Sequence, residues 1–202
     1  WGPERTFERS LQVQRQAALT LSRLHPDVVP PEHAQEISTR ANLDVIDQNK
    51  IRELEAKTGH DVIAINTSLE EQVSRAAAAH INKAKTSADT TQPARALQLK
   101  ASLEVIADSV ENLRDITIEK ALAWIDKPYM DTSHLYDALP SVAGRAFAHY
   151  IEMLQSGLDH LRFVYDNSIK GKWADATGNH HSATTLGIDG IALQAAYCSD
   201  LG

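Results

Sequence analysis

Two segments of the sequence carry apolar side chains at the spacing of a long, coiled helix. The first set follows at intervals of four and three residues: Leu99, Leu103, Ile106, Val110 and Leu113. The second repeats this alternation: Phe147, Ile151, Leu154, Leu158, Leu161 and Tyr165. Apolar residues at heptad spacing form one stripe along a helix, and two such helices pack best at a shallow angle. The sequence therefore predicts an all-α fold built on a bundle of long helices.

Shorter helices are predicted on both sides of this pattern. Residues 3 to 56 read as two or three helices, which the paired Pro30 and Pro31 separate because proline ends one helix and can start the next. A last helix is expected to begin near Thr184, with no evident partner before Gly202. Neither strand-like alternation nor a βαβ rhythm is apparent. We expect a small N-terminal helical domain over residues 1–80 and the first part of the bundle over residues 81–202.

Charge and composition narrow the possible functions. The chain carries a net charge of -7, which argues against broad nucleic-acid binding because that mode relies on clustered Lys and Arg. No apolar run approaches the roughly 18 residues needed to span a bilayer, so no membrane association is expected. The single cysteine, Cys198, fits a reducing compartment. These features predict a cytoplasmic protein.

The stretch "KTSADTTQPA" gathers polar side chains just before a long helix. Thr86, Ser87, Asp89, Thr90 and Thr91 precede a predicted helix whose first turn contains Pro93. A linker, a helix cap and an anion cradle are the three interpretations. One side chain is enough to cap a helix, whereas a helix N-terminus with several hydroxyl groups can hold a carboxylate or phosphate. From the residues alone, both the capping loop and the anion cradle remain open.

Two histidines lie beside predicted helix ends. His60 occurs in "TGHDVIA" and His134 in "MDTSHLYDALP". Each could be a structural residue, or could exchange a proton with a substrate because imidazole titrates near neutral pH. A metal site is not expected, since no two histidines are four residues apart and Cys198 has no neighbouring cysteine.

Taken in order, these segments resemble the adenylosuccinate lyase branch of the fumarase and aspartase superfamily. The resemblance begins at Trp1, continues through "IRELEAKTGHDVIAI" and the Thr-Ser-x-Asp box at residues 86–89, and ends with "SHLYDALPSVAG" and "GKWADATGN". It implies the all-α fold of that superfamily, apparently truncated here. Further segments of the family pattern, including a loop with the serine thought to act as general base, would precede Trp1 and follow Gly202.

The resemblance also implies a chemistry. Such enzymes remove a proton next to a carboxylate, form a stabilised carbanion and expel a leaving group from the adjacent carbon to release fumarate. For adenylosuccinate, the other product is AMP, in purine biosynthesis. No cofactor is implied. The partners implied are a small succinyl substrate and further copies of the chain, in a homotetramer whose active sites each draw segments from three chains.

Site residues follow from the same resemblance. His134 matches the general acid that protonates the departing nitrogen, and His60 matches a histidine that binds and orients the polar half of the substrate. Thr86 and Ser87 would hold a carboxylate of the succinyl group. The remaining matches are substrate-binding positions of the Thr-Ser-x-Asp box and of the Gly-Lys segment: Asp89, Lys172, Gly178 and Asn179.

The sequence also differs from the usual family pattern at several positions. Gly59 stands where arginine is common, Leu135 and Tyr136 replace glycine and glutamine after the general acid, and "ADATGN" replaces "SGAVGT". Another substituted succinate therefore stays open as the substrate. A non-catalytic helical assembly module is the alternative from a different class.

Overall fold

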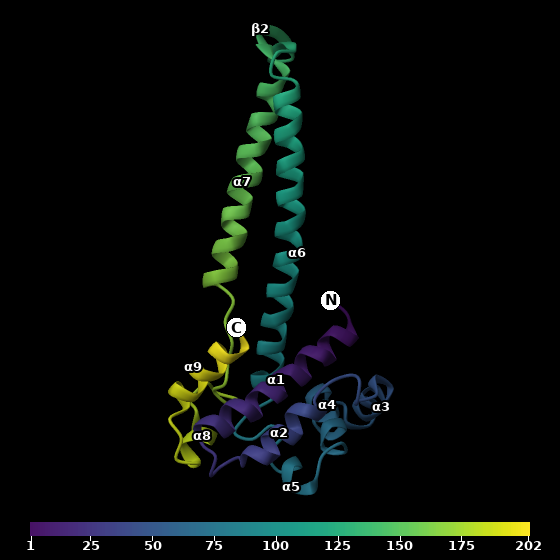
Figure 1. The fold of residues 1–202 in the computed structure, drawn as a ribbon, viewed down its shortest axis with the longest axis vertical. Helices are drawn as coiled ribbons and strands as arrows, with labels where there is room; N and C mark the ends of the chain where they lie inside the picture. The colour runs from purple at the N-terminus through teal and green to yellow at the C-terminus, as the bar shows by residue number, and fades with distance from the viewer. The chain divides into compact units, whose positions relative to one another are not determined.

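A computed structural model describes residues 1–202, which divide into two compact units (Figure 1). The first unit joins Trp1–Gln98 to Lys170–Gly202, and the second comprises Leu99–Ile169. This division differs from the boundary predicted near residue 80. The C-terminal segment packs with the N-terminal helices, a long-range pairing that no local sequence pattern specifies.

The first unit is entirely helical. Its helices are α1 (Pro3–Leu24), α2 (Pro31–Arg40), α3 (Gln48–Thr58), α4 (Asp61–Glu70), α5 (Arg75–Ala78), the beginning of α6 (Ala88–Ala123), α8 (His181–Thr185) and α9 (Gly190–Leu201). Pro31 is the first residue of α2, where its missing N–H costs nothing. The prediction that the proline pair separates two helices is confirmed.

Helix α1 forms the centre of the first unit's core. Leu11, Val13 and Leu21 are buried on it, and α2, α4 and α9 all contact it. Figure 1 shows α9 beside the C-terminal part of α1. Leu193 and Tyr197 of α9 are buried. The expectation that the last helix lacks a partner is therefore wrong, since apolar periodicity shows which face a helix buries but not against which element.

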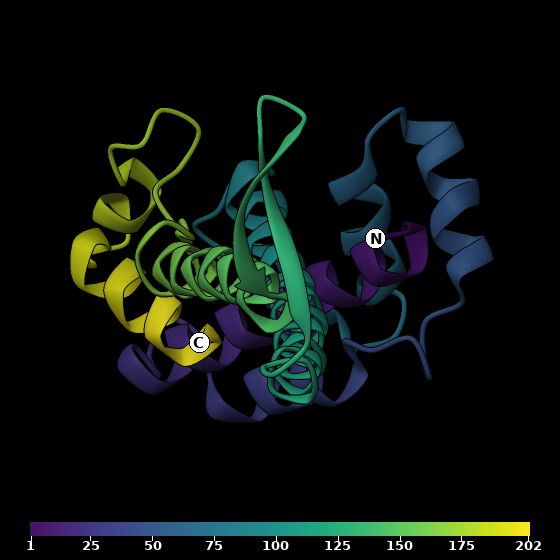
Figure 2. The same ribbon diagram turned by 90° about the horizontal axis from the view of Figure 1, so that it is seen from above.

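The second unit contains the rest of α6, a two-stranded sheet and α7 (Ala143–Asn167). Helices α6 and α7 lie side by side in both ribbon views (Figures 1 and 2). Leu158 is fully buried, whereas Ile106 and Leu113 of the first heptad stripe are 48% and 52% exposed. The two predicted long helices are confirmed, and much of the α6 stripe stays uncovered within this chain. None of the helices is long and apolar enough to cross a membrane.

An antiparallel hairpin joins the two long helices. Strands β1 (Pro128–Ser133) and β2 (Tyr136–Val142) pair with an irregularity between Asp131 and Thr132. The expectation that the chain has no strand is wrong at this place. Most of both strands is exposed, so the segment lacks the apolar alternation that marks a half-buried strand. The fold is otherwise the predicted all-α class.

Gly144, near the start of α7, lies against the end of α6. Its N–H donates to the carbonyl of Trp124 at 2.9 Å, and a Cβ added here would lie 2.4 Å from the carbonyl oxygen of Ala121. Gly144→Ala is therefore expected to destabilise the second unit by about 1–3 kcal/mol, measurable by chemical denaturation. The control is Gly157→Ala on the same helix, where the added Cβ meets nothing within 4 Å and should be neutral or stabilising. Equal effects of the two substitutions would contradict this prediction.

Candidate active site

The turn between α3 and α4 positions His60. Helix α3 ends at Thr58, and its C-cap is Gly59, whose left-handed conformation (φ 65°) favours glycine. His60 follows as the N-cap of α4, and its Nδ1 accepts a long hydrogen bond, 3.4 Å, from the N–H of Ile63. The local turn thereby fixes the imidazole at a helix N-terminus.

His60 contacts Ser87, which lies 27 residues further along the chain. The His60 Nε2 and the Ser87 Oγ are 3.2 Å apart. In the tautomer whose Nδ1 accepts from Ile63, the Nε2–H donates to Ser87 and leaves the serine hydroxyl hydrogen available to an anion. Two residues singled out in separate sequence motifs are thus in contact.

Helix α6 begins earlier than predicted. It starts at Ala88, and Pro93 lies inside it rather than in its first turn. The carbonyl of Ser87 already accepts from the N–H groups of Thr90 and Thr91, at 3.0 and 2.9 Å, so the chain is helical from Ala88. Thr86 and Ser87 consequently sit at the positive end of a helix.

Asp89 holds two distant segments together. Its side chain is fully buried and accepts a hydrogen bond from the ammonium of Lys172 at 2.5 Å. It also accepts the backbone N–H groups of Thr86, Ala174 and Asp175, each at 3.0 Å. Burial alone would raise the pKa of Asp89, but these hydrogen bonds outweigh it and hold the pKa below its usual value. Asp89 therefore fixes the Thr86 turn and the Lys172 segment rather than facing solvent.

The Lys172 segment continues into a polar loop. Asp175, which stands where the family pattern has glycine, has a φ of 68° and accepts from the N–H of Ser182 at 2.6 Å. Beyond it, Gly178 and Asn179 are exposed, and Gly178 has a φ of 78°. Both residues lie in the same unit as His60.

A buried polar network beneath the Thr86 turn was missed by the sequence analysis. Gln14 of α1 is 2% exposed and donates to Asn66 at 2.6 Å and to Thr90 at 3.2 Å. Its carbonyl oxygen accepts from Lys85 at 2.7 Å. The available signal was a glutamine within the apolar face of α1, between Leu11 and Ala17.

Lys85 ends inside this network, with its ammonium 5.8 Å from the centre of the Trp173 ring. Burial lowers the pKa of Lys85 to about 7, and the nearby Asp89 opposes this shift. Trp173 is itself 1% exposed and donates from its indole N–H to the carbonyl of Ala84 at 2.6 Å. The turn that carries Thr86 and Ser87 is therefore held in place by the buried hydrogen bonds of Lys85 and Trp173.

Strained backbone marks the same polar segments. The non-glycine residues with positive φ are Asn82, Ala84, His134, Leu135, Asp175 and His180. Each left-handed residue of this kind costs about 1 kcal/mol or more, and such strain tends to accumulate at functional sites. All of them lie within a few residues of a predicted site residue.

His134 belongs to the second unit. With Leu135 it forms the two-residue turn of the hairpin, with φ values of 52° and 69°. Positive φ at both central residues is the geometry of a tight hairpin turn, which Asn and Gly usually occupy. Leu135 is 99% exposed and Tyr136 78% exposed, so this turn projects its side chains into solvent.

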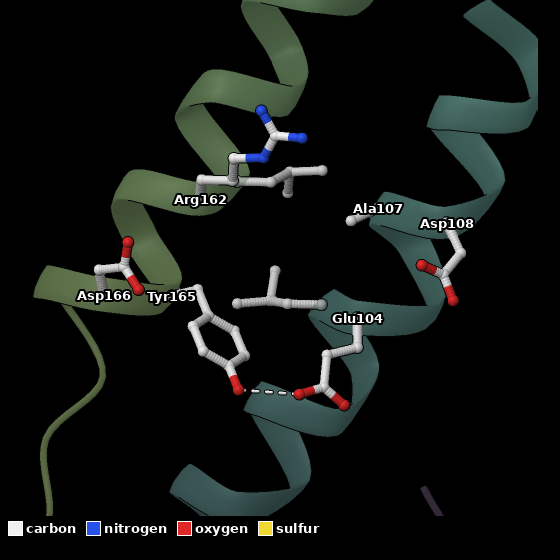
Figure 3. Close-up of a pocket in the computed structure, with 8 residues that line it drawn as sticks. Glu104, Ala107, Asp108, Arg162, Tyr165 and Asp166 are labelled. Atoms are coloured by element: carbon white, nitrogen blue, oxygen red, sulfur yellow. Dashed lines mark hydrogen bonds between the residues drawn. The ribbon is translucent and has the colours of Figure 1, made fainter. Parts of the chain in front are cut away.

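The predicted residues thus form two sets. The first unit brings together His60, Ser87, Thr86, Asp89 and Lys172 through the contacts above. The second unit carries His134. A separate pocket between α6 and α7 is lined in part by Glu104, Arg162 and Tyr165, and it contains none of the predicted site residues. Figure 3 shows the hydrogen bond from Tyr165 to Glu104 in this pocket. No group of three or more His, Cys, Asp and Glu side chains is placed to hold a metal ion.

Comparison with known proteins identifies the family. A family model described as lyase matches residues 5–189. The chain belongs to the lyase family of the fumarase and aspartase superfamily. The matched range includes His60, the Thr86–Asp89 box, His134 and Lys172. The superfamily predicted from the motifs is confirmed.

Curated members of this family are similar along the chain. The adenylosuccinate lyase of Pyrococcus abyssi is 29% identical over 202 residues, which cover 100% of this chain and 44% of that protein. The adenylosuccinate lyase of Methanocaldococcus jannaschii is 30% identical over 162 residues, covering 80% of this chain and 35% of that protein. The chain spans less than half the length of these relatives.

Solved structures show the same fold. A fumarate lyase from Mesorhizobium sp. superposes with a TM-score of 0.89 at 20% identity, over 99% of this chain and 46% of that one. A β-carboxy-cis,cis-muconate cycloisomerase from Acinetobacter calcoaceticus gives a TM-score of 0.86 at 19% identity, over 100% of this chain and 46% of the other. The fumarase and aspartase type of fold is therefore confirmed. The aligned region of the second structure includes the hairpin, since it covers the whole of this chain.

Proposed function

We propose that this lyase-family chain serves in a β-elimination that releases fumarate from a substituted succinate, with adenylosuccinate as the substrate and AMP as the second product. The observation that carries this proposal is the 3.2 Å contact of His60 with Ser87 at the N-terminus of α6. Proteins named adenylosuccinate lyase at 29% and 30% identity support the choice of substrate. We place the reaction in purine biosynthesis, in the cytoplasm.

The first unit supplies the anion-binding half of this chemistry. Thr86 and Ser87 offer hydroxyl groups at the positive end of α6, and His60 orients the Ser87 hydroxyl. A carboxylate bound there lies next to the carbon that loses its proton, so the charge that develops on that carboxylate is stabilised by groups already in place. Asp89 and Lys172 hold the turn in this position.

The second unit supplies the proton donor in our proposal. As the bond from carbon to the leaving nitrogen breaks, its electron pair passes to nitrogen, and His134 delivers a proton there. A general base takes the C–H proton, and by the family resemblance this base is the serine of the family's signature loop. The electron pair left by the C–H bond forms the double bond of fumarate. His60 binds the polar half of the substrate, and Lys172, Gly178 and Asn179 contribute to the same substrate site. We propose a homotetramer that assembles each site from different copies of the chain.

Fumarate release from adenylosuccinate, followed by absorbance with the purified protein, tests the proposal. Ser87→Ala is expected to lower kcat/KM about 10- to 100-fold, because the serine makes a hydrogen bond to a charged group. Ser109→Ala is the matched control, since its hydroxyl is exposed and bonds only to the carbonyl of Val105 on its own helix. It should leave kcat/KM unchanged.

A panel of other N- and O-substituted succinates separates the alternatives. The exposed Leu135 and Tyr136, in place of glycine and glutamine, favour a leaving group other than a nucleotide as the second candidate. Release of fumarate from another member of the panel, but not from adenylosuccinate, would shift the proposal to that substrate. No release from any member would leave the non-catalytic helical assembly module.

A further inference from the structure

Lys85 is a cation without a carboxylate partner. Its Nζ donates to the carbonyl oxygen of Gln14 at 2.7 Å and to the hydroxyl of Thr90 at 3.4 Å, both neutral groups. Asp89 is the carboxylate that acts on it electrostatically, but Asp89 already accepts the ammonium of Lys172. When Lys85 is protonated, these three groups leave one positive charge uncompensated.

Lys85 adjoins the proposed anion site in sequence, and its ammonium bonds to Thr90 in the first turn of α6. Lys85 immediately precedes Thr86 and Ser87, and its side chain runs inward beneath the turn that they form. The face of Trp173 covers the ammonium on one side, which reduces its contact with water. A cation that is poorly hydrated and lacks a counter-ion is stabilised by any anion that binds nearby.

We propose that Lys85 balances the charge of the dicarboxylate bound at Thr86 and Ser87, and that binding of this dianion draws a proton from solvent onto the Lys85 amine. The inference rests on the proposed function, since it concerns the same anion site. Lys85 acts through its charge and not through contact with the substrate. Lys85 lies outside the motif that carries the family resemblance, because the Thr-Ser-x-Asp box begins at Thr86.

The direction of the effect follows from the state of the free protein. Burial lowers the pKa of Lys85 to about 7, so roughly half of the molecules carry the charge near neutral pH. A bound anion raises this pKa, so binding takes up about half a proton at pH 7. Above pH 7 the free protein must acquire the proton before it binds tightly, and succinate affinity should fall about fivefold between pH 7 and pH 8.

Other titratable groups near Lys85 are few. His80 and Lys83 line the same small cavity together with Gln14 and Trp173. Burial lowers the pKa of His80, and the neighbouring Lys83 and His33 lower it further. Lys172 remains paired with Asp89, and His60 faces Ser87. Each of these groups is retained in the variants below, so a difference between variants isolates Lys85.

The test is calorimetric titration of succinate into the purified protein in buffers of different ionisation enthalpy, which measures proton uptake. Wild-type protein is expected to take up about half a proton at pH 7. Lys85→Met should show no uptake and weak affinity that does not change between pH 7 and pH 8. Lys85→Arg, which stays charged, should show no uptake but keep its affinity at pH 8. Circular dichroism establishes that both variants are folded, and Lys83→Met should behave as wild type.

Four outcomes would overturn the inference or separate it from the proposed function. Proton uptake that persists in both Lys85 variants, or is absent from wild-type protein that binds succinate, overturns it. Lys85-dependent uptake without fumarate release from any substrate would sink the lyase reaction but leave the anion site standing. Absence of succinate binding would overturn both.

Discussion

Asp89→Ala is expected to lower the free energy of unfolding of the first unit by about 3–5 kcal/mol. The substitution leaves the ammonium of Lys172 without its carboxylate, and it removes the acceptor for the N–H groups of Thr86, Ala174 and Asp175. A largely buried cation, 21% exposed at its side chain, and several backbone donors left without partners are costly in a protein interior. Urea denaturation monitored by tryptophan fluorescence measures the loss, because Trp173 lies in this unit.

The control for Asp89 is another acidic residue of the same unit. Glu8 pairs with Arg5 on the surface of α1, at 2.7 Å, with both side chains well exposed. Glu8→Ala should change the free energy of unfolding by no more than about 1 kcal/mol. Asp89→Asn, which keeps the shape but loses the charge, should fall between the two. If Asp89→Ala were as mild as Glu8→Ala, the carboxylate would not hold the two segments together.

The pKa of Asp89 gives this contribution a defined pH dependence. The folded pKa lies below the usual value, so the stabilising contribution is fully present above the unfolded pKa of about 4 and is lost as the pH falls through the folded pKa. Wild-type protein should therefore lose stability in strong acid, and the difference between wild type and Asp89→Asn should shrink there.

In the proposed mechanism His134 is the general acid, so His134→Gln is expected to lower kcat by about 100- to 10,000-fold, the usual range for removal of such a group. His60→Ala should lower kcat/KM through loss of the hydrogen bond to Ser87. His149→Ala is the matched control, because His149 is an exposed histidine on α7 of the same unit as His134. It should retain wild-type kcat.

Mixing His60→Ala with His134→Gln, the two variants of impaired activity, tests whether one site uses different chains. If His60 and His134 of a site come from different copies, an equal mixture of His60→Ala and His134→Gln should contain intact sites in about a quarter of positions after random assembly. Activity should then recover toward about a quarter of the wild-type value. Mixed oligomers that assemble but stay inactive would count against shared sites.

Local patterns in the sequence predicted the elements better than their partners. The heptad stripes predicted α6 and α7, and Pro31 predicted the start of α2. The hairpin was not predicted, because its strands are mostly exposed and carry no apolar alternation. The start of α6 was placed too late because Pro93 suggested a first turn, whereas the carbonyl of Ser87 already receives helical hydrogen bonds.

The candidate site shows the same limit. The Thr86–Ser87 turn and His60 were recognisable as motifs, but their contact spans 27 residues and depends on the tertiary packing that brings the start of α4 to the start of α6. Gln14 and Lys85 were missed because each looks unremarkable in its own segment, and their pairing at 2.7 Å spans 71 residues. Contacts of this kind depend on tertiary packing, which helical periodicity does not encode.

The pairing of Asp89 with Lys172 has a consequence for how the protein is made. A ribosome that synthesises about 5–20 residues per second takes roughly 4–14 s to add Leu99–Ile169 after Gln98 has emerged. During that interval α9 does not yet cover α1, and the carboxylate of Asp89 does not yet have its ion pair with Lys172. The apolar surface of α1 that α9 later covers is therefore exposed to solvent during this interval. This is the stage of synthesis at which we expect a chaperone to bind the first unit most.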